Sequence, residues 1–138
     1  GSVVAVMPVP DEETHRYGVV GVDSERAADK RLHRVSKLVE KPKAGAAPSN
    51  LAIIGRYVLT PKVFEKLEQT QRGAGGEIQL TDAIEALMEE QTVHAYEFEG
   101  RRLDAGTTAG WLQASVELAL RRPELAPDFR AYLRSLEL

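Results

Sequence analysis

The chain has 138 residues, of which 18 are basic and 21 acidic, giving a formal charge of −3. The length suits one domain with a buried core, and the small, scattered charge argues against a nucleic-acid partner. The absence of cysteine excludes disulfides and thiolate chemistry and fits a cytoplasmic location. No apolar run approaches the roughly 20 residues that a membrane span needs, so no membrane partner is expected.

The first predicted strand occupies residues 3–7, a β-branched apolar run. Natural chains usually begin with a few loosely held residues. A strand at the very start therefore leads us to expect that this sequence is a piece of a longer protein.

Two further segments predict an antiparallel hairpin. Residues 17–23 and 35–39 are rich in β-branched residues, and the charged segment 24–32 is expected to be the loop between them. Pro42 lacks a backbone N–H and biases Lys41 toward extended geometry, so the second strand is expected to stop there.

Residues 51–59 form the longest apolar strand pattern of the chain and predict burial on both faces, with helices above and below the sheet. Thr60 and Pro61 are typical of the N-cap and first residue of a helix. Thr81 is expected to cap a second helix. The apolar residues of that helix recur at helical spacing: Ile84, Leu87 and Met88.

The last third of the chain predicts one strand and two helices. The strand covers residues 93–98, the first helix starts at Thr108 and ends before Pro123, and the second starts at Pro127. Trp111 lies among apolar residues at helical spacing, which favours a core position. The alternation of strands and helices predicts an α/β fold with a mixed sheet flanked by helices.

The candidate site residues begin with Glu40 and Lys41. The carboxylate can accept hydrogen bonds from sugar hydroxyls, and the ammonium can neutralise a phosphate. Adjacent residues on a strand point to opposite sides, so both can meet one ligand only if the strand ends or twists there. The alternative interpretation is an exposed, charged strand end.

Asp104 and Gly18 are the other candidates. Asp104 precedes a run of small residues and can be a ligand of Mg²⁺ or, alternatively, an ordinary turn or N-cap residue. Gly18 interrupts a β-branched strand, which often marks a bulge or the close approach of a ligand to the backbone.

Several motifs, in this order, resemble the C-terminal half of the bacterial UTP–glucose-1-phosphate uridylyltransferases. Tyr-Gly-Val-Val and Glu-Lys-Pro occur widely among sugar nucleotidylyltransferases, whereas two other segments are closer to the uridylyltransferase branch. The motifs are Tyr17-Gly18-Val19-Val20, Glu40-Lys41-Pro42, Ser49-Asn50-Leu51-Ala52, Gly73-Ala74-Gly75-Gly76-Glu77-Ile78-Gln79-Leu80-Thr81-Asp82 and Leu103-Asp104-Ala105-Gly106.

The resemblance implies a Rossmann-like nucleotidyltransferase fold and formation of UDP-glucose and pyrophosphate from UTP and glucose 1-phosphate, with Mg²⁺ as cofactor. It implies that Tyr17, Gly18 and Glu40 lie at the sugar, that Lys41 is the catalytic and phosphate-binding residue, and that Asp104 approaches the metal. It also implies a homo-oligomer.

The resemblance further implies that residues 1–138 are a single or partial domain without the family's N-terminal nucleotide-binding part and its Gly-rich loop. We therefore expect the chain to be inactive alone. Two alternatives stay open: a sibling enzyme that uses another nucleotide or sugar 1-phosphate, and a non-catalytic assembly module that pairs through exposed strand edges.

Overall fold

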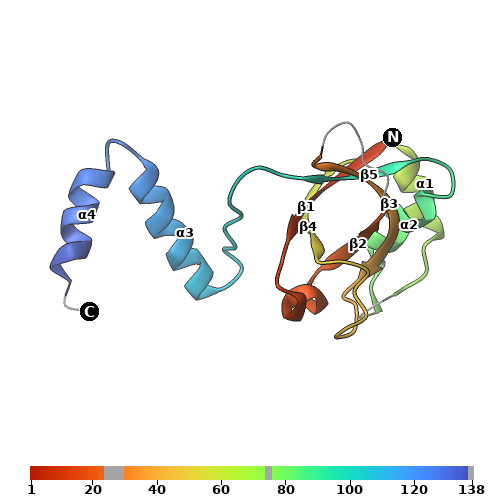
Figure 1. The fold of residues 1–138 in the computed structure, drawn as a ribbon, viewed down its shortest axis with the longest axis horizontal. Helices are drawn as coiled ribbons and strands as arrows, with labels where there is room; N and C mark the ends of the chain where they lie inside the picture. Colours follow the sequence, from red (N-terminus) through yellow and green to blue (C-terminus); the bar gives the residue numbers. More distant parts are fainter. Residues whose placement is uncertain (24–29, 74–75, 137–138) are drawn as a thin grey trace. The chain divides into compact units, whose positions relative to one another are not determined.

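The computed structural model describes residues 1–23, 30–73 and 76–136, which form two compact units, Gly1–Glu99 and Gly100–Leu138. Figure 1 labels the helices and strands of both units. The strands of the first unit are β1 (Ser2–Pro8), β2 (Gly18–Val22), β3 (Leu32–Glu40), β4 (Leu51–Val58) and β5 (Val93–Glu97). Its helices are the 3₁₀ helix η1 (Asp11–Arg16) and the α-helices α1 (Lys62–Gln69) and α2 (Leu80–Leu87).

The strands of the first unit close into a barrel in the order β1-β4-β2-β3-β5. β2 and β3 form the predicted antiparallel hairpin, although residues 24–29 of its expected loop lie outside the described part of the chain. β5 pairs in parallel with β1 and antiparallel with β3, which closes the barrel. The prediction of a mixed sheet is confirmed, and its closure is an additional finding.

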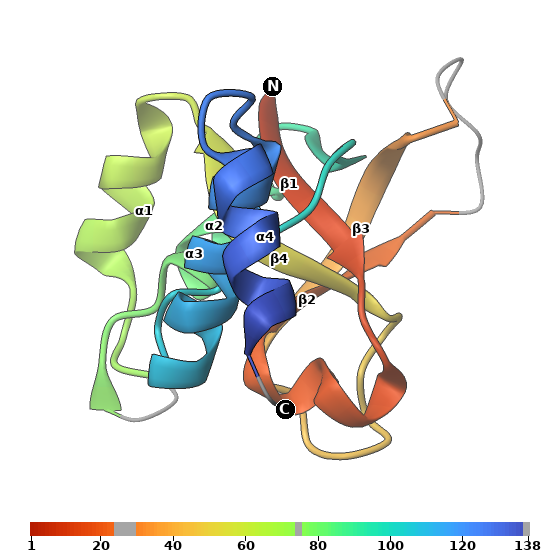
Figure 2. The ribbon, with the colours of Figure 1, turned by 90° about the vertical axis from the view of Figure 1, so that its left-hand side faces the viewer.

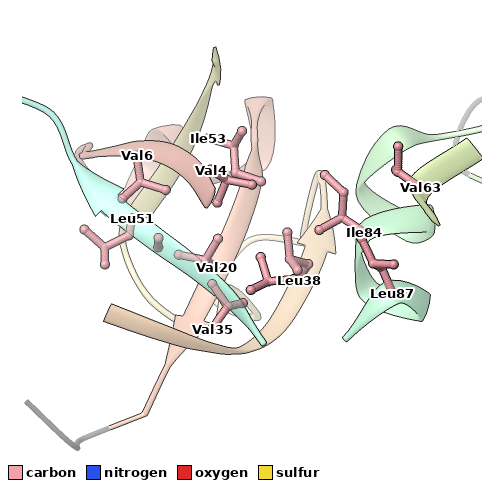
Figure 3. Close-up of a cluster of buried hydrophobic side chains, with 12 residues drawn as sticks. Val4, Val6, Val20, Val35, Leu38, Leu51, Ile53, Val63, Ile84 and Leu87 are labelled. Carbon is pink, nitrogen blue, oxygen red and sulfur yellow. The ribbon is translucent and has the colours of Figure 1, made fainter. Parts of the chain in front are cut away.

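The core of this unit joins the barrel to the two α-helices. Figures 1 and 2 show α1 and α2 together on one side of the barrel, and Figure 3 shows the buried side chains that connect them to the strands. Ile84 and Leu87 of α2 have no exposed surface, and Leu38 of β3 is 2% exposed. The other members of the cluster are Val4, Val6, Val20, Val35, Leu51, Ile53, Val63, Val93 and Ala95.

The prediction that β4 is buried on both faces is wrong for its second half. Leu51, Ala52 and Ile53 are buried, whereas Tyr57 is 37% and Val58 71% exposed. The register explains the change, because β2 pairs with β4 only at Ala52 and Leu51. The second half of β4 therefore has β1 as its paired neighbour and extends past the hairpin.

Both predicted helices of the first unit form, but neither Thr60 nor Thr81 uses its side chain as a cap. The Thr60 hydroxyl accepts a hydrogen bond from Gln91 Nε2 at 2.9 Å, and the buried Ser2 hydroxyl accepts one from the same nitrogen at 3.0 Å. These bonds tie the start of β1 to α1 and to the segment after α2. Thr81 lies inside α2, and its hydroxyl donates elsewhere.

Three charged side chains link α1 to the segment after α2. The Glu90 carboxylate lies 2.5 Å from Lys62 Nζ and 2.6 Å from Lys66 Nζ. The hydrogen bond from Lys62, followed by that from Lys66, lowers the pKa of Glu90 from 4.5 to about 2. A carboxyl whose pKa falls on folding stabilises the protein above its unfolded pKa, and the contribution disappears as the pH falls toward the folded pKa.

We therefore expect the thermal stability of the chain to fall more steeply between about pH 5 and about pH 2 than that of Glu90→Gln, which lacks the titrating group. Tm measured against pH for both proteins checks this. Glu89→Gln, at the neighbouring exposed position, is the control and should follow the unmodified chain. A constant difference in Tm between Glu90→Gln and the unmodified chain over this range would contradict the prediction.

The second unit contains α3 (Thr108–Arg121) and α4 (Ala126–Ser135), at the predicted positions. Thr107 caps α3, because its hydroxyl accepts a hydrogen bond from the Gly110 amide at 3.1 Å. The predicted core position of Trp111 is wrong, since this residue is 57% exposed while Ala114 is the buried residue of α3. Among the described residues, no helix has the length and apolarity needed to span a membrane.

Candidate functional site

The hairpin end places four of the predicted site residues together. Gly18 at the start of β2 pairs with Glu40 at the end of β3. The Lys41 amide then donates a hydrogen bond of 3.0 Å to the Tyr17 carbonyl. Gly18 is buried, Tyr17 and Glu40 are half-buried and Lys41 is exposed. The strand pairing, which depends on the β-branched runs on both sides, therefore assembles this group.

The backbone of Lys41 has a left-handed conformation, with φ of 46°. The prediction that Pro42 keeps Lys41 extended is therefore wrong. A residue with a side chain is uncommon at positive φ, and such strain costs about 1–3 kcal/mol and clusters at ligand sites. Because Lys41 departs from strand geometry, the alternation that would direct it away from Glu40 ends at this residue.

Thr81 of α2 also contacts this group. Its hydroxyl donates a hydrogen bond of 2.7 Å to Glu40 Oε2, and the residue is only 7% exposed. The sequence pattern predicted Thr81 as a helix cap and did not predict this contact. The sequence does contain one indication of this contact. Thr81 and Ile84 are three residues apart, so in a helix that starts before Thr81 the two side chains lie on the same face, and Thr81 then faces the core together with Ile84.

Gly18 leaves the space that Glu40 and Thr81 occupy. A Cβ atom at this position would lie 2.9 Å from Glu40 Oε2, 3.1 Å from Thr81 Oγ1 and 3.3 Å from Ile53 Cδ1. The close approach anticipated for Gly18 is thus made by the protein's own side chains. The hairpin bulge lies elsewhere, between Gly21 and Val22.

Replacing Gly18 with alanine is expected to displace the Glu40 carboxylate and to lower the free energy of unfolding by about 1–3 kcal/mol, as overpacking typically does. Urea unfolding of the variant measures the cost. The same substitution in a Glu40→Ala background should cost less, because the nearest clashing atom is gone. An equal cost in both backgrounds would contradict this account of Gly18.

Tyr57 of β4 adds a phenol to the surroundings of Glu40. Burial and, to a smaller extent, the negative charge of Glu40 raise the pKa of Tyr57. A tyrosine hydroxyl is protonated at neutral pH even without this shift, and it can donate a hydrogen bond. Glu40, Tyr57 and Lys41 thus offer an acceptor, a donor and a cation, the groups that recognise a hydroxylated molecule carrying an anionic phosphate.

Asp104 belongs to the second unit and takes the turn role that the sequence left open as an alternative. Its Oδ1 accepts a hydrogen bond from the Gly106 amide at 2.9 Å, and its Oδ2 accepts one from Arg102 Nη2, also at 2.9 Å. The side chain is about half exposed, at 49%. Across the described ranges, no group of three His, Asp or Glu side chains is arranged to hold a metal ion.

A separate cavity of about 300 Å³ lies between η1 and the loop before β4. None of the predicted site residues lines it. Its hydroxyl groups are engaged within the protein, since Thr14 donates to the Asp11 carbonyl at 2.7 Å and Ser49 donates to the Val20 carbonyl at 2.5 Å. The group around Glu40 is the better candidate for binding a hydroxylated phosphate, because it combines a carboxylate with a cation, whereas no Lys or Arg is among the described residues that line this cavity.

The family model described as nucleotidyl transferase matches residues 1–120. The chain belongs to the nucleotidyl transferase family. The predicted fold class, an α/β mixed sheet with helices in a nucleotidyltransferase domain, is confirmed by this match and by the observed sheet.

Curated relatives of this nucleotidyl transferase chain carry the name UTP–glucose-1-phosphate uridylyltransferase. The one from Staphylococcus epidermidis is 49% identical over 99% of this chain and 46% of its own length. The one from Bacillus subtilis is 48% identical over 98% of this chain and 45% of its own length. The chain therefore spans about half the length of the relatives it matches.

Solved structures of UDP-glucose pyrophosphorylases are also similar to this chain. A UTP-bound UDP-glucose pyrophosphorylase from Acinetobacter baumannii superposes with a TM-score of 0.85 at 38% identity, covering 99% of this nucleotidyl transferase chain and 46% of that chain. A UDP-glucose pyrophosphorylase complexed with UDP-glucose superposes with a TM-score of 0.80 at 40% identity, covering 88% and 45%. Both similarities extend over most of the described fold.

Proposed function

We propose that the chain provides the sugar-phosphate side of an enzyme that converts UTP and glucose 1-phosphate into UDP-glucose and pyrophosphate. The observation that carries the proposal is the pairing of Gly18 with Glu40 next to the strained Lys41 at the end of the hairpin. The names of the relatives support the choice of UTP and glucose 1-phosphate. The proposed activity is the one for which the full-length relatives are named, and this chain spans about half of their length.

In the proposed reaction, Glu40 and the Gly18 backbone bind glucose hydroxyls, Tyr17 borders the sugar and Lys41 binds its phosphate. A phosphate oxygen of glucose 1-phosphate attacks the α-phosphorus of UTP in line, and the bond from that phosphorus to the bridging oxygen breaks as pyrophosphate leaves. Catalysis then consists of positioning and charge neutralisation, without a covalent enzyme intermediate. Lys41 lowers the repulsion between the two phosphate groups.

Asp104 is the proposed protein ligand of Mg²⁺. A carboxylate suits this ion, which takes one or two carboxylates together with phosphate oxygens and water. Asp104 fits one ligand position, with Arg102 as the partner that a cation would displace or share. When bound, the ion would neutralise phosphate charge.

Isothermal titration of the chain with glucose 1-phosphate, glucose and inorganic phosphate tests the sugar-phosphate role. We expect glucose 1-phosphate to bind more tightly than either part alone, because it engages both Glu40 and Lys41. Equal binding of glucose 1-phosphate and inorganic phosphate would contradict a role for Glu40 in sugar recognition. No binding of glucose 1-phosphate would overturn the proposed function.

A second assay tests the expectation that the chain is inactive alone. UDP-glucose formation is measured from UTP and glucose 1-phosphate with Mg²⁺ and this chain as the only protein. We expect no turnover, and turnover without an added partner would overturn that expectation. Repeating the assay and the titration with other nucleotides and sugar 1-phosphates separates the proposed enzyme from a sibling with different substrates.

A further inference from the structure

A short hydrogen bond from α2 holds the Glu40 carboxylate. Glu40 ends β3 and Thr81 lies in the first turn of α2, so two elements distant in sequence meet at Oε2, 2.7 Å from Thr81 Oγ1. Thr81 is 7% exposed and β-branched, and a β-branched residue in a helix has few side-chain rotamers. The direction of its hydroxyl is therefore set largely by the position of α2.

Gly18 leaves room for this hydrogen bond because it has no side chain. An added Cβ at Gly18 would meet both Glu40 Oε2 and Thr81 Oγ1 within 3.1 Å. The Gly18 Cβ position, Glu40 Oε2 and Thr81 Oγ1 thus lie within about 3 Å of one another, and the described residues show a hydrogen bond to Oε2 but none to Oε1. One carboxylate oxygen of Glu40 is therefore held by Thr81.

We propose that Thr81 is a positioning residue that fixes Glu40 Oε2 and so orients Oε1 toward a hydroxyl of the bound sugar phosphate. The inference rests on the proposed function, because the ligand is the one proposed for Glu40. Thr81 acts through Glu40 and needs no contact with the reacting phosphates. Its hydroxyl, rather than its methyl group, carries this role.

The chain offers matched variants that separate the hydroxyl from packing. Thr81→Val keeps the shape and removes the hydroxyl, whereas Thr81→Ser keeps the hydroxyl and removes the methyl group. If valine disturbs the fold, the effect of the hydroxyl can instead be measured by comparing Thr81→Ala with Thr81→Ser, which differ only in that group. Circular dichroism and Tm verify that each variant is folded.

The experiment is isothermal titration of these variants with glucose 1-phosphate, combined with Glu40→Gln in a double-mutant cycle. Thr81→Val is expected to raise Kd about tenfold, the effect of losing one hydrogen bond to a charged group. Thr81→Ser should restore Kd to within about twofold of the unmodified chain. In the Glu40→Gln background, Thr81→Val should change Kd little, because residues that act through one another are not additive.

The results also separate this inference from the proposed function. If the unmodified chain binds glucose 1-phosphate and Thr81→Val and Thr81→Ala bind it equally well, the role of Thr81 is overturned and the proposed function stands. If Thr81→Ser loses as much affinity as Thr81→Val, or if Thr81→Val costs the same with and without Glu40, Thr81 acts through packing and the inference fails. If the unmodified chain does not bind, both are overturned.

Discussion

Replacing Lys41 with alanine is expected to raise the Kd for glucose 1-phosphate by ten- to a hundredfold, roughly the cost of losing a charge-assisted hydrogen bond to phosphate. Binding of glucose should change by less than about twofold, because the sugar hydroxyls interact with Glu40. Alanine keeps a Cβ at the left-handed position, so the backbone strain is the same in both proteins. Isothermal titration with both ligands measures the two losses.

Lys43→Ala is the matched control, since it removes an exposed lysine two residues further along the chain. Its Kd for glucose 1-phosphate should equal that of the unmodified chain. Equal losses for glucose and glucose 1-phosphate in Lys41→Ala would contradict the assignment of Lys41 to the phosphate. An effect of the same size in Lys43→Ala would indicate a general charge effect instead.

Replacing Ile84 with alanine is expected to lower the free energy of unfolding by about 2–5 kcal/mol, the usual cost of truncating a large core side chain. Ile84 is fully buried in the cluster that joins α2 to the barrel, and Figure 3 shows it beside the strand residues of that cluster. The same helix carries Thr81, so a loosened α2 should also weaken ligand binding. Urea unfolding followed by far-ultraviolet circular dichroism measures the stability.

Ile78→Ala provides the control, because it makes the same chemical change at a residue that is 54% exposed. We expect it to change the free energy of unfolding by less than about 0.5 kcal/mol. If the two variants lost similar stability, the packing of α2 on the barrel would be contradicted. A loss at Ile84 alone supports it.

The positions of the helices and strands could be predicted from the sequence better than the pairing between strands. The hairpin, the two α-helices that follow β4 and the two helices of the second unit follow from β-branched runs, helical spacing and proline positions, which are local signals. The closure of the barrel depends on the pairing of β1 with β5, which no local pattern encodes. The exposure of the second half of β4 likewise depends on where β2 stops pairing.

The candidate site shows the same division. Glu40 and Gly18 were predicted as a site from residue type, and the strand register places them opposite each other. The left-handed backbone of Lys41 contradicts the simple effect of a following proline, because strain of this kind is imposed by surrounding structure. Thr81 was predicted as a helix cap from its residue type, and its contact with Glu40 was missed because the two residues lie 41 positions apart in the chain.

The parallel pairing of Ser2 with Val93 and of Val6 with Glu97 has a consequence for how the first unit folds. β1 is the first strand in the sequence and β5 is the last strand of the unit. β1 completes its hydrogen bonding only when β5 pairs with it, so the loop closed by this pairing includes nearly the whole unit. Structures dominated by such distant pairings have high contact order and fold in milliseconds to seconds rather than microseconds. The β2–β3 hairpin, whose paired residues are 13 to 22 positions apart in the chain, closes a much shorter loop and can form earlier. The pairing of Gly18 with Glu40 would then precede the closure that completes the barrel around it.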